Sequence, residues 1–216
     1  FEVNVPASLK LLEIAGEAGV RKWIGLGSQS EYGSHRTLCS EAEPLAPNDL
    51  YSKSKVATYQ QSVPIAQNYG VELVWFRLFA VYGPEDNAHF LLPHVIETLL
   101  RGEKPKLTAG SQRCDYLYVA DAVEALVQAA LTPGLQGVLN LGSGETHSVR
   151  TIVEKVRDLI DPKLSLGFGE LANPAAVTHL QADIRKVKAA LQWSPKTELE
   201  AGLRRMIDWF KLQQTG

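Results

Sequence analysis

Short apolar runs alternate with segments of helical periodicity in this chain, and that alternation restricts its fold more than any other feature. Residues 22–27 and 71–76 each predict a short buried strand. Residues 5–18 predict one helix, and a second is expected from Asn48 or Asp49 to about Gly70. Buried strands joined through helices form parallel sheets with right-handed crossovers. The sequence therefore predicts a doubly wound α/β sheet.

The rest of the chain continues the same pattern. Further helical periods cover 87–101, 119–131, 148–160, 183–191 and 198–213, short strands are expected near 116–119 and 137–142, and 102–110 and 167–174 are expected to be loops. Pro64 lies inside the second helix, where its ring and missing N–H predict a kink or a restart near Ser62. Because no long linker is present, we expect any second domain to be interleaved with the first.

Composition and charge exclude several classes of function. The 22 basic and 24 acidic side chains give a net charge of −2, which leaves no large basic face for nucleic acid or anionic lipid. The longest apolar stretch, 71–82, contains a glutamate and an arginine and is too short to cross a bilayer. The two cysteines fit a reducing compartment, and the five histidines show no metal-ligand spacing. We expect a cytoplasmic protein without a metal site.

Three polar residues combine into a candidate catalytic site. Ser28 directly follows the strand 22–27, and in an open α/β sheet ligands bind beyond the carboxyl ends of the strands. Tyr51 and Lys55 are four residues apart, so they share one helix face with their Cβ atoms about 6 Å apart. An ammonium group so close favours a phenolate, which suits the tyrosine to exchange a proton with an alcohol or carbonyl. The same pair also occurs on solvated helix faces, and the position of Ser28 is what favours a site.

Five segments in order carry a resemblance to a known family. They are Gly27–Gly33, Tyr51–Lys55, Arg77–Pro84, Asp115–Asp121 and Asn140–Gly144. Together they resemble the signatures of the extended short-chain dehydrogenases/reductases, the NAD-dependent epimerase/dehydratase family. The resemblance implies a Rossmann-type sheet in residues 1–84 and 113–145, which would form the dinucleotide-binding domain. Residues 85–112 and 146–216 would then form a small interleaved substrate-binding domain.

The resemblance also implies roles for individual residues. Tyr51 would be the catalytic acid/base, and Lys55 would tune it while binding the nicotinamide ribose of NAD or NADP. Ser28 would orient the substrate hydroxyl. Asn4 and Phe79 match positions that usually touch the cofactor.

Departures from the family pattern narrow the expected activity. Gln29 and Ser30 stand where dehydratases carry an Asp-Glu pair, and since an amide cannot donate and recover a proton, elimination is not expected. Ala80 replaces a usual asparagine. Cys114 replaces an arginine that clamps the diphosphate of nucleotide sugars, and Arg113 lies one residue earlier, where an extended chain turns it to the opposite face.

Three further expectations concern loops. Members of the family begin with a Gly-x-x-Gly-x-x-Gly loop, and this sequence lacks it. We therefore expect an N-terminally truncated piece that is inactive alone. In such a piece the strand 22–27 would lie exposed at a sheet edge. Residues 142–144 resemble part of a phosphate loop but are expected to be structural. Glu41 and Glu43 are expected in a solvated loop.

The sequence leaves three functions open. We expect an NAD(P)-dependent oxidoreductase or epimerase that acts on C4 of a nucleotide-linked hexose through Ser28, Tyr51 and Lys55. An NAD(P)-dependent ketone or aldehyde reductase for a non-sugar substrate would use the same three residues. A non-catalytic dinucleotide-binding protein would not need all three of them, so their presence argues against it. The family resemblance further implies a homodimer formed through helix 5–18 and the helix that holds Tyr51.

Overall fold

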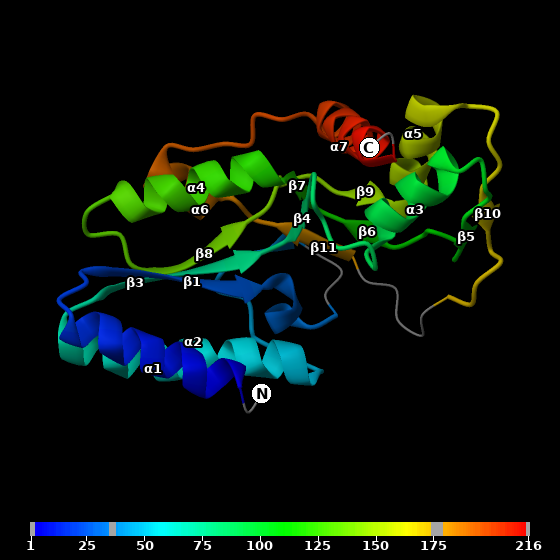
Figure 1. The fold of residues 1–216 in the computed structure, drawn as a ribbon. Coiled ribbons are helices and arrows are strands. Elements are labelled where there is room, and N and C mark those ends of the chain that lie inside the picture. The colour runs from blue at the N-terminus through cyan, green and yellow to red at the C-terminus, as the bar shows by residue number, and fades with distance from the viewer. Residues whose placement is uncertain (1–2, 35–37, 174–178, 215–216) are drawn as a thin grey trace.

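A parallel three-stranded sheet forms the centre of the molecule (Figure 1). The computed structural model describes residues 3–34, 38–173 and 179–214. Strands β1 (Lys22–Ser28), β3 (Glu72–Leu78) and β8 (Gly137–Leu141) lie in the order β1-β3-β8. Lys22 pairs with Glu72, and the register continues to Ser28 and Leu78. The predicted neighbouring strands are therefore found, with β1 at one edge of this sheet.

Helices cover both faces of the sheet, as expected for a doubly wound fold. Helices α1 (Asn4–Glu17) and α2 (Leu50–Tyr69) lie together on one face, and α4 (Val119–Leu131) and α6 (Arg185–Leu191) lie on the other (Figure 1). The side chain of Asp49 caps α2 by accepting from the Ser52 N–H at 2.7 Å, and Gly70 ends it with φ of 66°.

The restart expected near Ser62 does not occur. α2 runs without interruption through Pro64, which lies on the exposed side of the helix. Ser62 and Ala66 lie on the buried side, and packing on that side offsets the backbone bond that proline removes.

A second layer is built from short strands and three helices. Strands β2 (Leu38–Cys39), β11 (His179–Ala182), β6 (Arg113–Cys114) and β9 (His147–Ser148) form one small sheet. Strand β4 (Ala80–Tyr82) pairs with β7 (Tyr116–Tyr118), and β5 (Lys106–Leu107) pairs with β10 (Gly167–Phe168) inside the two predicted loops. Helices α3 (Leu91–Leu100), α5 (Val149–Ile160) and α7 (Leu199–Gln214) lie beyond them.

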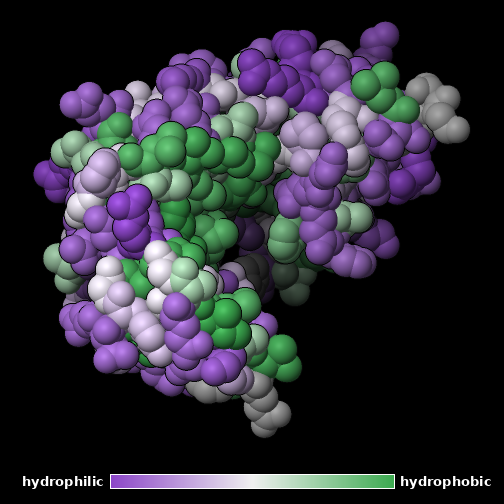
Figure 2. Space-filling view, turned by 60° about the vertical axis from the view of Figure 1, so that its left-hand side comes forward, coloured by the Kyte–Doolittle hydropathy of each residue, from purple (hydrophilic) through white to green (hydrophobic). Residues whose placement is uncertain are grey.

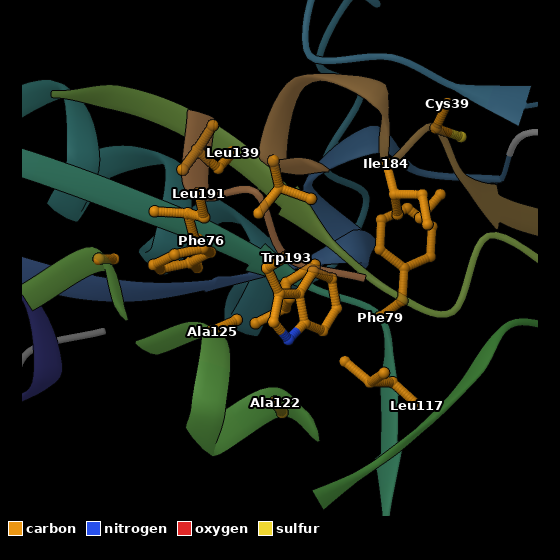
Figure 3. Packing of buried hydrophobic residues seen from close by; sticks show 14 of the residues in the cluster. Cys39, Phe76, Phe79, Leu117, Ala122, Ala125, Leu139, Ile184, Leu191 and Trp193 are labelled. Carbon is orange, nitrogen blue, oxygen red and sulfur yellow. The ribbon is translucent and has the colours of Figure 1, made fainter. Parts of the chain in front are cut away.

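One hydrophobic core packs against the central sheet, and another lies among α3, α5 and α7. The first core includes Trp193, Phe76, Phe79 and Leu139 and lies on the side of the sheet that α4 and α6 cover (Figure 3). The second core joins α3, α5 and α7. No helix in the described part of the chain is long and apolar enough to cross a membrane.

Some apolar side chains remain exposed. Figure 2 shows hydrophobic residues gathered on a hollowed face of the molecule. Along α4, Val123, Val127 and Leu131 form an exposed row at helical spacing. On the edge strand β1, Leu26 is 43% exposed, whereas Trp23 and Ile24 are half-buried. The edge expected for residues 22–27 is therefore present, with one of its three apolar side chains largely in solvent.

Candidate active site

Ser28 lies at the carboxyl end of β1, where the chain turns into the short helix η1 (Gln29–Tyr32). The Ser28 hydroxyl oxygen accepts hydrogen bonds from the backbone N–H of Ser30 at 3.2 Å and from the Ser30 hydroxyl at 2.9 Å. Because these bonds use both acceptor positions of the oxygen, the Ser28 hydrogen is the part that can be donated to a substrate oxygen.

A buried ion pair fixes the turn that carries Ser28. Glu31 is fully buried and accepts from the Ser28 backbone N–H at 3.0 Å. It also accepts from the Trp75 indole N–H at 3.1 Å and from Arg77 Nε at 2.9 Å. A buried carboxylate is stable only when it is paired and hydrogen-bonded, and Glu31 meets both conditions. Sequence reasoning missed this network, because Trp75 and Arg77 come from a strand more than 40 residues away.

The network continues across the sheet to β8. Arg77 donates to the Tyr32 hydroxyl at 2.9 Å, and that hydroxyl donates to the Asn140 side-chain oxygen at 2.7 Å. Burial raises the pKa of Tyr32, while its hydrogen bonds with Arg77 and Asn140 oppose that shift. The backbone N–H of Asn140 donates to Glu41 at 2.7 Å. Glu41 was expected to be solvated; it is half-buried instead, because an edge-strand N–H needs an acceptor.

Helix α2 brings Lys55 and Tyr51 to the end of β1. Lys55 Nζ donates to the backbone oxygen of Leu26 at 2.8 Å, two residues before Ser28. The same nitrogen lies 5.5 Å from the centre of the Tyr51 ring. Burial lowers the pKa of Lys55, and the negative charge of Glu31 opposes that effect. Tyr51 is 53% exposed, so its ring is accessible from solvent.

Lys55 and Asn4 line one pocket, but Phe79 does not. The pocket has a volume of about 190 Å³ and is also bordered by Ser54, Thr58 and Trp75. Phe79 is 3% exposed and packs in the first core, with its ring centre 6.4 Å from that of Tyr32 (Figure 3). The structure thus places four of the five predicted residues at this end of the molecule around β1, and the Phe79 side chain in the core.

A second pocket of about 370 Å³ lies beside Gln29, the residue after Ser28. Ala80, Phe90 and Tyr116 contribute to its walls, and Asp86 adds a carboxyl group. The side-chain oxygen of Gln29 is buried and has no hydrogen-bond partner among the described residues. Burial raises the pKa of Asp86, and a bond from the Asn87 N–H opposes the shift. This pocket offers both apolar walls and unsatisfied acceptors.

The glycine-serine segment after β8 is held by a buried carboxylate. Asp115 accepts from the Ser143 N–H at 2.6 Å and from the Gly144 N–H at 3.0 Å. A Cβ at Gly142 would lie 2.6 Å from the Ala182 side chain, so the close approach of β11 requires glycine there. These backbone donors are used within the fold, which supports the structural role expected for 142–144.

Cys114 stands at the position where an arginine was expected from the family pattern, so this position has no guanidinium group. Arg113 donates to the backbone oxygen of Thr146 at 2.6 Å and is exposed. Cys114 is half-buried, and burial raises the pKa of its thiol.

Comparison with known proteins agrees with the fold and with the positions of these motifs. The family model "NAD dependent epimerase/dehydratase family" matches residues 1–142. The chain is 30% identical over 209 residues to an uncharacterized UDP-glucose epimerase, YtcB, of Bacillus subtilis, covering 94% of this chain and 65% of that protein. It is 29% identical to the UDP-glucuronate 4-epimerase of Thermodesulfobacterium geofontis, covering 96% of this chain and 65% of the relative.

A solved structure extends the similarity to three dimensions. The UDP-glucuronic acid 4-epimerase of Bacillus cereus, in complex with UDP-glucuronic acid and NAD, superposes with a TM-score of 0.89 at 25% identity. The match covers 97% of this chain and 68% of that one. The chain thus spans about two thirds of the length of the relatives that it matches.

The parallel sheet covered on both faces, with polar residues at the ends of its strands, defines a Rossmann-type α/β protein. More specifically, the chain belongs to the NAD-dependent epimerase/dehydratase family of extended short-chain dehydrogenases/reductases.

Proposed function

We propose that this protein is an NAD(P)-dependent enzyme that epimerises or reduces a nucleotide-linked hexose at C4. The observation that carries the proposal is the position of the Lys55 ammonium group, which lies 5.5 Å from the centre of the Tyr51 ring and donates to the backbone oxygen of Leu26, two residues before Ser28. The named relatives act on UDP-linked sugars, which supports a substrate of that class.

The residues near the end of β1 fit the nicotinamide-ribose part of NAD or NADP. Lys55 and Asn4 present an ammonium and an amide to one pocket, and both groups bind ribose hydroxyls well. When bound, the cofactor supplies or accepts a hydride. The Bacillus cereus relative holds NAD, which favours NAD over NADP.

Residues of this chain transfer the hydroxyl proton of the substrate and bind its oxygen. Tyr51 takes the hydroxyl proton of the substrate as the alcohol becomes a ketone, and returns it when the ketone is reduced. Ser28 donates a hydrogen bond to the same oxygen, which stabilises its developing negative charge. The Lys55 charge stabilises the Tyr51 phenolate between the two steps. Gln29 provides no exchangeable acid, so elimination is not part of the proposal.

A reductase for a non-sugar ketone or aldehyde is the second candidate. The arrangement of Arg113 and Cys114 favours it, because neither residue offers a cation where nucleotide-sugar enzymes hold a diphosphate. Such an enzyme would use the same proton chemistry and would reduce a small carbonyl compound in the absence of any nucleotide.

Replacing Tyr51 tests the proposed chemistry. In the full-length protein, Tyr51→Phe is expected to reduce kcat by about 10²-fold or more with the fold preserved, because general acid–base catalysis contributes about 10²–10⁴-fold. The measurement is steady-state turnover of a UDP-hexose with NAD(H), with circular dichroism as the check on folding. Tyr69→Phe at the far end of α2 is the matched control and should leave turnover unchanged. Near-normal turnover of Tyr51→Phe would exclude this residue as the acid/base.

We further propose a homodimer in which α1 and α2 pair with the same helices of a second copy. Leu11 and Ile14 on α1 are 58% and 49% exposed, which supports an apolar contact there. Sedimentation of the full-length protein at micromolar concentration should give a dimer, and Leu11→Glu should shift it to monomer. Val127→Glu on α4 is the control, because Val127 is similarly exposed but lies on another face of the molecule. A wild-type monomer would exclude this assembly.

A further inference from the structure

The pocket beside Gln29 carries negative and acceptor groups on apolar walls. Ala80, Phe90 and neighbouring aliphatic side chains form the walls. Asp86 contributes a carboxyl group whose described hydrogen bond, from the Asn87 N–H at 2.8 Å, occupies one of its two oxygens. The Gln29 side-chain oxygen is buried without a partner among the described residues. The buried Gln29 oxygen therefore needs a hydrogen-bond donor, and the second oxygen of the half-buried Asp86 can accept another.

The third polar group of the pocket is the Tyr116 hydroxyl. Burial raises the pKa of Tyr116, and the nearby Cys114 and Asp86 add to that effect. The hydroxyl therefore stays protonated and can donate or accept. None of the described residues that line this pocket is a lysine, an arginine or a histidine.

A ligand carboxylate does not suit such a pocket. Inside a partly closed apolar site a carboxylate needs a cation to offset its lost hydration. Here it would instead lie near the Asp86 carboxylate, and like charges in such a setting repel strongly. A ligand hydroxyl or amide N–H, by contrast, would satisfy the unpartnered oxygens.

We propose that this pocket receives an uncharged, donor-bearing substituent of the hexose, such as a hydroxymethyl group, and discriminates against uronic acids through Asp86. The inference rests on the proposed function and narrows its substrate class. It separates this chain from those relatives that are named for UDP-glucuronate.

The test is calorimetric binding of UDP, UDP-glucose and UDP-glucuronate to the purified full-length protein in the presence of NAD. Wild type should bind UDP-glucose about 10-fold or more tightly than UDP-glucuronate. Asp86→Asn should reduce this ratio at least about threefold, mainly by improving UDP-glucuronate binding. Glu85→Gln is the matched control, because it removes the same charge from an exposed neighbour outside the pocket, and the ratio should not change.

The outcomes separate the inference from the function on which it rests. If UDP binds but wild type takes both sugar nucleotides equally, or prefers UDP-glucuronate, the specificity inference is wrong and the proposed function stands. An unchanged ratio in folded Asp86→Asn protein would overturn the role of Asp86. If UDP and both sugar nucleotides fail to bind, the proposed function is wrong and the inference falls with it.

Discussion

Two serine-bearing turns follow parallel strands at the carboxyl end of the central sheet, and they differ in what holds the serine. Ser28 follows β1 and Ser143 follows β8. Each turn is fixed by a buried carboxylate, Glu31 in the first and Asp115 in the second. Asp115 accepts from the Ser143 hydroxyl itself at 2.6 Å, whereas Glu31 accepts from the backbone N–H of Ser28 at 3.0 Å. The fold therefore uses the hydrogen of Ser143, whereas that of Ser28 has no acceptor among the described residues.

The two carboxylates are also compensated differently. Glu31 pairs with the Arg77 guanidinium, a strong and directional partner. Asp115 is surrounded by N–H and O–H donors from Ser143, Gly144 and Ala182, and no cation contacts it among the described residues. A serine and a buried carboxylate thus form a candidate catalytic turn after β1 and a structural turn after β8. The difference comes from which hydrogen each carboxylate receives.

The strongest test of this comparison replaces each serine by alanine. Ser28→Ala is expected to lower kcat about 10²-fold, since loss of one donor to a developing oxyanion costs about 10²–10³-fold. Ser143→Ala should leave kcat within about twofold but lower the free energy of unfolding by about 1–3 kcal/mol, because a buried carboxylate loses a partner. Steady-state kinetics and urea unfolding of both variants provide the measurements.

Each serine variant is the control for the other. Equal kcat in Ser28→Ala and wild type would show that the Ser28 hydrogen does not reach the substrate. A large loss of kcat in stable Ser143→Ala would show that the second turn also takes part in the reaction.

Much of the fold was predictable because its signals are local. The strand 22–27, the helix that holds Tyr51, and the strand 71–76 all follow from runs of apolar residues and from capping residues such as Asp49. Tyr51 and Lys55 were placed on one helix face from spacing alone, and their 5.5 Å contact agrees with that placement.

What the sequence did not reveal depends on contacts between distant segments. Glu31 follows Ser28 by three residues, but its burial depends on Trp75 and Arg77 in another strand. Glu41 was expected in solvent because its local sequence is polar, and a strand-edge N–H brings it inward. The packing of the Phe79 side chain with Tyr32 in the core was likewise not visible in the sequence. Local patterns cannot show such partners, because tertiary packing selects them.

A smaller effect, the dependence of stability on pH, follows from Asp115. Burial raises the pKa of Asp115, and its hydrogen bonds from Ser143, Ala182 and Gly144 oppose that shift. Between the ordinary aspartate value of about 3.9 and the raised value, the folded chain binds more protons at this site than the unfolded chain does. The contribution of Asp115 to the free energy of unfolding therefore falls as pH rises through that window, by at most about 1.4 kcal/mol per pH unit.

Urea unfolding of wild type and Asp115→Asn at several pH values from 4 upward measures this contribution. The difference between the two unfolding free energies isolates the slope from Asp115, even though the asparagine variant is less stable throughout because its NH₂ group cannot accept a bond. Asp208→Asn on the exposed side of α7 is the control and should run parallel to wild type. If wild type gained stability relative to Asp115→Asn as pH rose above 4, the hydrogen bonds would outweigh burial at Asp115. The second turn would then be held by a stabilised carboxylate, as the first is by the pairing of Glu31 with Arg77.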